Sequence, residues 1–498
     1  MTESTVLTDT TVFTESTGPV EKPQGAVESQ GPRIRRPGVV LAVVVGCQLM
    51  LTLDNTVMNV ALPRIQADLG FSAVGLSWVI SAYTLVFGGL LLLGGRAGDL
   101  LGRRRVFLAG VAVFTAASLL GGLADSPALL ISARAVQGLG AAAAGPSALA
   151  VLTTTFTAPK ARVRAFSVYT GVGSAGIVLG LVLGGLLTEL TSWRSVLFIN
   201  VPVGAAVIVF GARFIAESSR RRGGFDLPSA VTATAGLAAI VYGLTATARA
   251  GWQHASTLGV LAAGVVLIAG FVALEVRTKA PLIPLRLFAD RNRAVGYLNF
   301  FLGLTTLAII FFLTQFLQNV RRYSPLTTGF AFLPLAVTML VMTRLIPFLL
   351  QRFGARTLVV AGSASTMAGM IGLARLTPAS GYVGVLLVPL VLVGVGIGLG
   401  LAPLNVVVMA GVRAEDAGAA GGVLQTMQQV GTTFGLAMFI TVFGVAGRSA
   451  AASGADARHA MVTGIADVSI ASAIVSVCAL VLACTIRPLD SIRRSDAA

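Results

Sequence analysis

Runs of apolar residues long enough to cross a lipid bilayer recur along this whole chain, and they limit its fold more than any other feature. A helix of about 20 apolar residues crosses a hydrocarbon core about 30 Å thick. Lipid offers no hydrogen bonds, so each crossing segment has to satisfy its own backbone groups, as a helix does. We therefore expect an all-α polytopic membrane protein with 14 transmembrane helices, at residues 38–61, 74–95, 106–124, 128–156, 165–189, 196–215, 227–248, 256–276, 295–319, 325–350, 357–376, 381–410, 418–446 and 464–486.

The charged residues support this class and set an orientation. Only 11% of the residues are charged, against about 25% in soluble domains. A net charge of +16 would suggest a nucleic-acid partner in a soluble protein. Here the cations lie in short loops, with 26 of the 36 Lys and Arg residues on the side of the N-terminus and 8 on the other. We therefore expect the lipid bilayer and not nucleic acid as partner, with both termini in the cytoplasm.

Two basic linkers divide the spans into groups of six, two and six. They are Glu217–Asp226, after the sixth span, and Arg277–Arg293, after the eighth. Loop 96–105 and its counterpart Gln351–Arg356 take equivalent places in the two groups of six, as in a duplicated transporter. The expected units are a disordered cytoplasmic tail (1–37), a six-helix bundle (38–215), a linker with two inserted spans (216–294), a second six-helix bundle (295–486) and a cytoplasmic tail (487–498).

Asp54 is an ionisable residue inside the first apolar run. At about 1.5 Å per residue it lies roughly 24 Å from the inner end of that run. One interpretation is a carboxylate that merely reaches outward from the end of the span. The other is a proton- or cation-binding carboxylate that faces a central cavity, since acids at such depth are expensive and usually functional.

Arg134 is a second charge inside a span, and we expect it at a depth similar to that of Asp54. Its own span enters from the opposite side near Ala128, so Arg134 lies roughly 9 Å below that surface. An arginine does not release a proton at ordinary pH, but it favours the ionised form of a nearby carboxylate. The two residues could couple proton movement to transport or form a purely structural ion pair.

The stretch Gly95–Arg105, GRAGDLLGRRR, predicts a tight cytoplasmic loop with glycines at the turn. Asp99 lies among several arginines, which suggests a latch that holds one conformation through ion pairs. The alternative is that these arginines only anchor the loop on the cytoplasmic side of the membrane by their positive charge. The predicted latch residues are Gly95, Asp99, Gly102, Arg103 and Arg104.

Small and polar residues on helix faces suggest two further features. Gly176, Gly180 and Gly184, with the adjacent Gly185, lie at four-residue spacing and would allow close approach of another helix. Polar residues inside the spans could line a substrate cavity or only bond to neighbouring helices. The candidates are Asn55, Met58, Asn59, Gln137, Gln315, Gln425, Gln428 and Gln429.

The sequence does not favour a metal site, a cofactor or enzymatic chemistry. His254 and His459 lie in predicted loops, and the three cysteines (Cys47, Cys478 and Cys484) show no metal-binding spacing. The spans contain no paired carboxylates that could act as acid and base. A receptor without transport is also disfavoured, because no internal loop is long enough to hold a signalling domain.

Four motifs in order resemble the major facilitator superfamily, and within it the fourteen-span drug:proton antiporters. They are LDNTVMNVALP (Leu53–Pro63), GRAGDLLGRR (Gly95–Arg104), RAVQGLGAA (Arg134–Ala142) and WRSVLFINVPVG (Trp193–Gly204). In span 5, Leu181 follows Gly180 where that group has a proline, so the expected helix kink is missing.

The resemblance implies efflux of amphipathic drugs or antibiotics in exchange for protons, by alternating access in the cytoplasmic membrane of a bacterium. It further implies proton coupling through Asp54 and Arg134 in a protein that works as a monomer without a cofactor. A proton-coupled transporter of one specific metabolite is the alternative on the same fold. Substrate identity and proton stoichiometry do not follow from the sequence.

Overall fold

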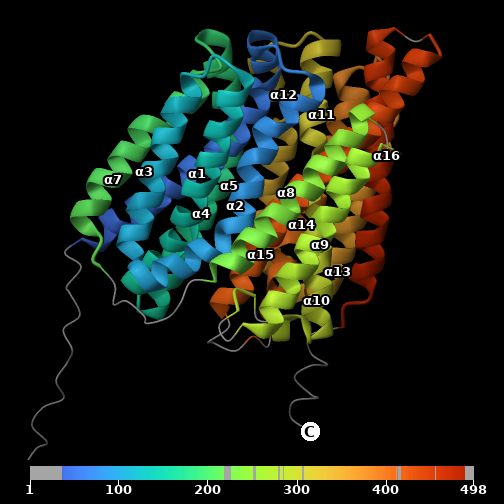
Figure 1. Ribbon diagram of the computed structural model, residues 1–498. Helices are drawn as coiled ribbons and strands as arrows, with labels where there is room; N and C mark the ends of the chain where they lie inside the picture. The colour runs from blue at the N-terminus through green and yellow to red at the C-terminus, as the bar shows by residue number, and fades with distance from the viewer. Residues whose placement is uncertain are drawn as a thin grey trace, which may run out of the picture.

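The computed structural model describes residues 36–217, 226–250, 254–278, 281–283, 285–305, 308–410, 412, 417–454 and 456–487. The two predicted tails fall almost entirely outside the described residues, as does most of the linker Glu217–Asp226. Within the described residues the chain forms long helices that run side by side (Figure 1).

The first half of the chain forms one group of packed helices. Its members are α1 (Pro37–Leu69), α2 (Ala73–Leu101), α3 (Arg103–Gly122), α4 (Pro127–Thr155), α5 (Pro159–Leu190), the short α6 (Ser195–Phe198) and α7 (Asn200–Phe214). Several of these helices begin where the sequence allows it. Proline occupies the first turn of α1, α4 and α5, and the Ser72 side chain accepts a hydrogen bond from the Gly75 N–H at the start of α2.

A helical hairpin and a second group follow. The hairpin consists of α8 (Leu227–Ala250) and α9 (Ala255–Arg277), and a short 3-10 helix (Leu285–Phe288) leads to the second group. That group contains α10 (Arg291–Thr305), α11 (Ile309–Gln315) with a π-helical turn (Phe316–Val320), α12 (Pro325–Ala331), α13 (Leu333–Leu373), a π-helical turn (Tyr382–Leu387) with α14 (Val388–Met409), α15 (Ala417–Ala452) and α16 (Ala457–Cys484).

The expectation of fourteen spans in a six, two and six arrangement is confirmed. Twelve helical segments of the described residues are long and apolar enough to cross a membrane. One of them, Pro325–Leu373, has 49 residues, about 74 Å of helix, and is interrupted at Gly354, where φ is 73°. It therefore supplies two crossings. Helix α10 and the shorter apolar helix Ile309–Val320 that follows it in the sequence together account for another.

Glycines let the helices of the first half approach closely. A methyl group on Gly140 of α4 would lie 2.6 Å from the backbone nitrogen of Phe114 in α3, and one on Gly138 would lie 2.5 Å from the carbonyl oxygen of Tyr83 in α2. Close packing of this kind replaces the hydrophobic effect, which is absent between helices in lipid. It fixes α2 and α3 against α4, the helix that carries Arg134.

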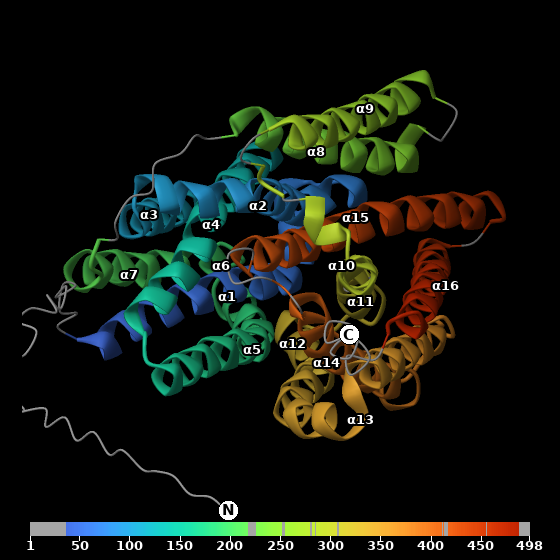
Figure 2. The same ribbon diagram turned by 90° about the horizontal axis from the view of Figure 1, so that it is seen from below.

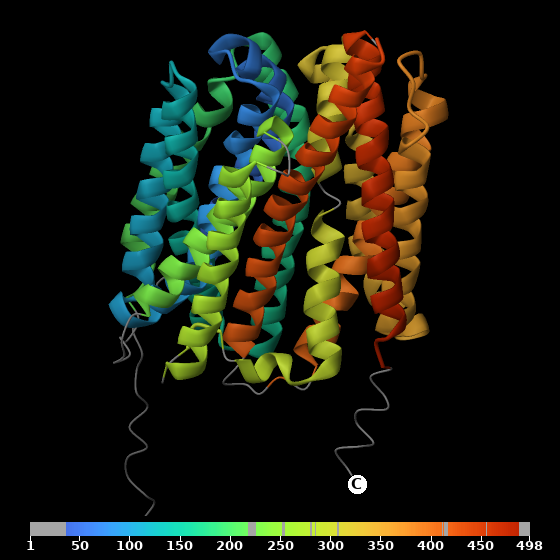
Figure 3. The same cartoon turned by 45° about the vertical axis from the view of Figure 1, so that its right-hand side comes forward.

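The inserted hairpin lies along one flank of the molecule and bridges the two halves. Helix α8 packs against α2 of the first half and α15 of the second (Figure 2). The Thr247 hydroxyl of α8 donates to the Thr441 hydroxyl of α15 at 3.0 Å. The view in Figure 3 shows α8 and α9 beside α15, which crosses the molecule obliquely.

The two halves also contact each other directly, through α2 with α15 and α5 with α12. Here the side of the molecule on which α1 begins and α16 ends is called the terminal side. The α5–α12 contact lies near the opposite side, where a methyl group on Gly185 would meet the carbonyl oxygen of Pro325 at 2.7 Å. Close to it, the Leu326 N–H donates to the Glu189 carboxylate at 2.9 Å.

Candidate functional site

Asp54 is completely buried near the middle of α1. Its side chain is 0% exposed. Helix α1 runs to Leu69, about two turns past the end of the predicted span. The complete burial of the side chain rules out the first interpretation of Asp54, a carboxylate that merely reaches outward from the end of its span.

Arg134 of α4 forms an ion pair with Asp54. Its Nη1 lies 2.5 Å from Oδ2 of Asp54, and its Nε donates to the carbonyl oxygen of Val79 in α2 at 2.9 Å. The guanidinium also lies over the ring of Tyr83, 4.5 Å from the ring centre. The similar depth expected for the two charges thus brings them into direct contact, although their helices are 80 residues apart in sequence.

Two amides complete the hydrogen bonds of Asp54. Its Oδ1 accepts from Nε2 of Gln137 at 3.1 Å and from Nδ2 of Asn200 at 2.9 Å. The Gln137 oxygen in turn accepts from Nη1 of Arg134 at 2.8 Å, and its amide nitrogen also donates to the Ser118 hydroxyl at 2.7 Å. The four partner side chains come from α3, α4 and α7, and each is at most 1% exposed.

This arrangement suits an ionised carboxylate. All three of its side-chain contacts are donors, and a buried charge is tolerated only when it is paired and hydrogen-bonded. Protonation of Asp54 would leave the Arg134 charge buried without a counter-ion, which is strongly unfavourable.

The glycine face of α5 packs on the part of α1 that carries Asp54. A methyl group on Gly184 would lie 2.9 Å from the Cα of Val57, and one on Gly176 would lie 3.2 Å from the Thr52 side chain. Gly180 faces the Thr56 side chain between them. Gly185 instead points away from α1, to Pro325 of the second half. The four glycines thus connect the helix of Asp54 with the contact between the two halves.

The predicted loop Gly95–Arg105 was wrong in its extent. Helix α2 continues through Leu101, and only Gly102 leaves the helical region, with a φ of 106°. Glycines break helices in water, but they are tolerated inside transmembrane helices. Gly95 and Gly98 therefore stay in the helix, and the turn between α2 and α3 consists of Gly102 alone.

The charged residues beside this turn are paired within the first half of the chain. Nη2 of Arg103 lies 2.9 Å from the Asp99 carboxylate. Arg104 donates to the carbonyl oxygen of Ala212 at the end of α7. Arg105 contacts the Glu217 carboxylate at 3.4 Å. These bonds tie α2, α3 and the segment after α7 together on the terminal side.

The polar residues predicted to line a cavity are placed in different environments. Met58 is completely buried in the apolar core, and Gln137 belongs to the Asp54 network. Asn55 and Asn59 are half-buried one turn apart, with the Asn59 amide donating to the Asn55 carbonyl oxygen at 2.8 Å.

The glutamines of the second half lie near the contact with the first half. Gln315 accepts from Asn319 at 2.7 Å, and its amide nitrogen lies 3.5 Å from the Gln66 oxygen of α1. Gln429 faces Gly88 of α2, and its buried amide nitrogen has no partner among the described residues. Gln425 and Gln428 are half-buried on the same helix.

Sequence reasoning missed Asn200 and Ser118 as members of the network. Asn200 occurs within the quoted motif WRSVLFINVPVG and follows the short helix α6. An amide inside an apolar span was a usable signal there. Ser118 had no comparable signal, because serine is common in transmembrane helices and usually bonds to its own helix.

Metal-ligating side chains do not cluster in the described part of the chain. No three His, Cys, Asp or Glu residues in those ranges lie close enough together to hold a metal ion.

Comparisons with known proteins agree on one family. A family model described as Major Facilitator Superfamily matches residues 44–436. The cephamycin export protein CmcT of Amycolatopsis lactamdurans is 44% identical over 411 residues, covering 81% of this chain and 85% of that protein. The puromycin resistance protein pur8 of Streptomyces alboniger is 42% identical over 428 residues, covering 84% of both chains.

A further relative and a solved structure extend these comparisons. The tetracenomycin C resistance and export protein of Streptomyces glaucescens is 36% identical over 428 residues, which are 85% of this chain and 79% of that one. The crystal structure of the nucleoside transporter NupG superposes with a TM-score of 0.60 at 13% identity, covering 89% of this chain and 99% of that chain. At that identity the likeness concerns the fold.

Proposed function

Because the chain belongs to the major facilitator superfamily, we propose that it exports amphipathic antibiotics or drugs from a bacterial cell in exchange for protons. The names of its relatives support export: one is a cephamycin exporter, one a puromycin resistance protein and one a tetracenomycin C exporter. The sequence motifs place it with the fourteen-span drug:proton antiporters. We further propose that a single chain is the working unit and that protons are the coupling ion.

The observation that carries the proton coupling is the sealed pair of Asp54 and Arg134. A titratable acid and a permanent cation lie 2.5 Å apart with exposed fractions of 0% and 1%. A structural pair of this kind costs desolvation energy that apolar residues would avoid. A coupling pair has a reason to keep that cost, since the charge of Asp54 can change during the transport cycle.

The orientation follows from the loop charges. With both termini in the cytoplasm, as the distribution of Lys and Arg indicates, the terminal side is cytoplasmic and the opposite side extracellular. The contacts of Gly185 with Pro325 and of Glu189 with Leu326 then close the extracellular side in this conformation. The Gln318 amide adds another closure, because it donates to the Val60 carbonyl oxygen across the two halves at 2.9 Å.

The transport cycle uses these contacts as gates. Opening of the extracellular side separates α5 from α12 and moves α1, so that a proton reaches Asp54 and releases its bond to Arg134. Return to the state that is closed on the extracellular side releases that proton to the cytoplasm and restores the pair. Asp99 and its neighbouring arginines hold α2 and α3 together at the cytoplasmic end, so that the first half moves as a rigid body.

A proton-coupled transporter of one metabolite remains the second candidate on this fold. Growth inhibition profiling separates the two. A bacterial host without its own exporters, expressing this chain, is expected to resist several amphipathic antibiotics, puromycin among them. A host that gains no resistance, while vesicles with the protein exchange a single metabolite in counterflow, would establish the second candidate.

Proton coupling is tested with purified protein in liposomes. Puromycin uptake is followed after an imposed gradient with the acidic side corresponding to the cell exterior. We expect uphill uptake by the native protein, little or none by Asp54→Asn, and partial uptake by Asp54→Glu as matched control. Uphill transport by Asp54→Asn at the native rate would show that Asp54 does not carry the proton.

A further inference from the structure

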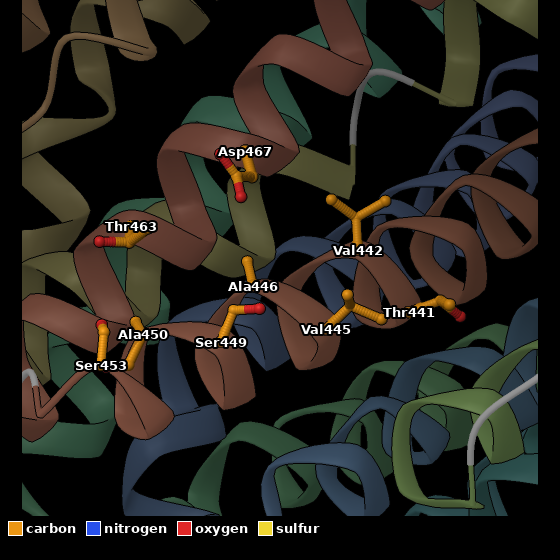
Figure 4. Close-up of a pocket in the computed structure, with 9 residues that line it drawn as sticks. All are labelled: Thr441, Val442, Val445, Ala446, Ser449, Ala450, Ser453, Thr463 and Asp467. Atoms are coloured by element: carbon orange, nitrogen blue, oxygen red, sulfur yellow. The ribbon is translucent and has the colours of Figure 1, made fainter.

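A pocket of about 610 Å³ lies between α15 and α16, near the end where these two helices are joined. It is lined by Thr441, Val442, Val445, Ala446, Ser449, Ala450, Ser453, Thr463 and Asp467 (Figure 4). Its volume is in the range of small-molecule sites. All of these residues belong to the second half of the chain, so the pocket is separate from the buried Asp54 network.

Asp467 gives this pocket its chemical character. Among the described residues of the lining it is the only ionisable one, and Figure 4 shows it on α16 facing Ala446 and Ser449 of α15. It follows the first residue of α16 by ten positions, or about 15 Å of helix. The described residues provide neither a hydrogen bond nor an ion pair to its carboxylate.

An unpaired carboxylate at this position requires an explanation, because acids within membrane-spanning helices are expensive and usually serve a function. The Asp54 carboxylate shows how this chain stabilises an acid that has only protein partners, with three donors around it. Asp467 has no such set in the described part of the chain. The partly exposed Asp467 carboxylate is therefore open to a partner from outside the protein.

Of the hydroxyl groups in the described lining, those of Ser449 and Thr463 are also available to a ligand. Thr441 and Ser453 already donate to backbone carbonyl oxygens, at 2.6 and 2.8 Å. Within the described residues, Ser449 and Thr463 have no side-chain hydrogen bond. The remaining wall is formed by valine and alanine side chains.

The exposed face of α16 shows how a ligand reaches the pocket. Ile470, Ile474 and Val481 on this helix are 49%, 60% and 59% exposed, as expected for a surface in contact with lipid. Asp467 precedes Ile474 by seven residues, which is close to two helical turns, so the two lie on nearly the same face. A molecule dissolved in the lipid can therefore slide along this face to the carboxylate.

We propose that this pocket binds the cationic end of an amphiphile from the outer half of the membrane. The ammonium or other cation pairs with Asp467, Ser449 and Thr463 add hydrogen bonds, and the apolar body lies against Val442, Val445 and Ala446. The cation has two sources: a small amphipathic cation in the membrane, or the amine headgroup of phosphatidylethanolamine. The site is a second one, apart from the coupling pair of the proposed transport function.

The test measures protection of a cysteine inside the pocket. In full-length protein with its three native cysteines replaced by alanine, Ser449→Cys is reacted with a maleimide in phosphatidylglycerol nanodiscs. Tetraphenylphosphonium, a permanent lipophilic cation, is the probe, and the neutral triphenylphosphine oxide is its matched control. Ala457→Cys, at the exposed start of α16, reports any general effect of the probe, and Thr463→Cys is a second reporter if Ser449→Cys does not fold.

We expect the cation to slow labelling at Ser449→Cys but not at Ala457→Cys, and the neutral compound to have little effect. Asp467→Asn should weaken this protection by at least about tenfold, because tetraphenylphosphonium has no hydrogen-bond donor and interacts with the Asp467 carboxylate through charge alone, whereas Asp467→Glu should keep it. Protection of Ser449→Cys by the cation should also persist in Asp54→Asn. Binding at this pocket would then be independent of the proposed proton coupling. Equal protection in Asp467→Asn, or by the neutral compound, would overturn the proposal.

Changing the lipid composition of the nanodiscs distinguishes the phosphatidylethanolamine headgroup from the small cation as the occupant. If phosphatidylethanolamine alone protects Ser449→Cys, and does so only with Asp467 present, the amine headgroup is the occupant. If it does not protect while tetraphenylphosphonium does, the occupant is the small cation. Absence of protection by both cations at both cysteine reporters would refute the site.

Discussion

Both halves of this transporter bury an arginine, but the partners of the two arginines differ in kind. Arg134 in the first half contacts the Asp54 carboxylate, which can gain or lose a proton. Arg293 in the second half is 8% exposed and donates to the carbonyl oxygens of Val408 at 3.2 Å, Leu287 at 3.4 Å and Ala410 at 3.3 Å. Carbonyl oxygens do not titrate, so a proton does not act directly on the contacts of Arg293.

This difference suggests a division of labour between the halves. A buried arginine on neutral acceptors ties chain segments together, here the short helix before α10, α10 itself and the end of α14. A buried arginine paired with an acid forms a contact that depends on whether the acid is protonated. Under the proposed function, the proton chemistry belongs to the first half, and the second half supplies a surface against which the first half moves.

The largest predicted effect distinguishes the two arginines directly. Lysine keeps the charge but cannot place separate donors on Val79, Asp54 and Gln137 as the planar guanidinium does. Arg134→Lys should therefore reduce proton-driven puromycin uptake by about a hundredfold, as for disruption of a buried ion pair. Arg293→Lys should keep uptake within about threefold.

Liposome transport at matched protein amounts measures this contrast. Arg291→Lys, at an exposed position on the same helix as Arg293, controls for surface effects. Equal losses in Arg134→Lys and Arg293→Lys would show that both arginines are structural and that the division between the halves is incorrect.

The next effect concerns Asn200, which stabilises the charge of Asp54 from α7. Its amide donates to Oδ1 at 2.9 Å in a fully buried site, and a hydrogen bond to a charged group contributes roughly 1.5–3 kcal/mol. Asn200→Ala should lower the rate of uphill uptake by about tenfold. The matched control is Asn299→Ala in the second half, where the amide bonds to the neutral carbonyl oxygen of Ala479.

Asn299→Ala should reduce thermal stability without changing the dependence of transport on external pH, whereas Asn200→Ala should change that dependence. The measurement is initial uptake over a series of external pH values. A pH dependence that is native in Asn200→Ala would separate Asn200 from the coupling site.

A smaller effect, on thermal stability, is expected from substitutions in the two loops that take equivalent places in the halves, 96–105 and Gln351–Arg356. Gly102 and Gly354 both have positive φ, at 106° and 73°, and alanine is strained at such angles. A methyl group on Gly102 would also lie 2.5 Å from the Glu217 carboxylate, whereas nothing lies within 4 Å of one on Gly354. Gly102→Ala should therefore lower the melting temperature by several degrees more than Gly354→Ala, measured by thermal denaturation in detergent.

Features that belong to regular helices could be predicted from the sequence. Spacing and helical rise predicted the class of fold, the number of crossings and the similar depth of Asp54 and Arg134. They also predicted the common face of Gly176, Gly180 and Gly184. These are properties of one regular helix at a time, and lipid removes most alternatives to a helix.

Features that depend on how helices pack were not predictable in the same way. Gly98 looked like a turn residue, but helix α2 continues through it to Leu101, and only Gly102 forms the turn. Gln137 looked like a cavity residue, yet it bonds to Asp54 because α4 approaches α1 closely. Asn200 joined the site only when α7 was placed beside α1. Asp467 already lay inside the predicted span 464–486, but only the structure shows the pocket that α15 and α16 form around it.

The smallest predicted effect tests whether the network beyond Asp54 matters for coupling. Ser118 accepts a hydrogen bond from Gln137 and donates to the carbonyl oxygen of Phe114, but it does not touch the carboxylate. Ser118→Ala leaves one amide hydrogen of Gln137 without its acceptor, which costs about 1 kcal/mol, so uptake should fall by no more than about fivefold. A loss in liposome transport as large as that of Asn200→Ala would show that the orientation of Gln137, and not only direct contact with Asp54, controls the proton site.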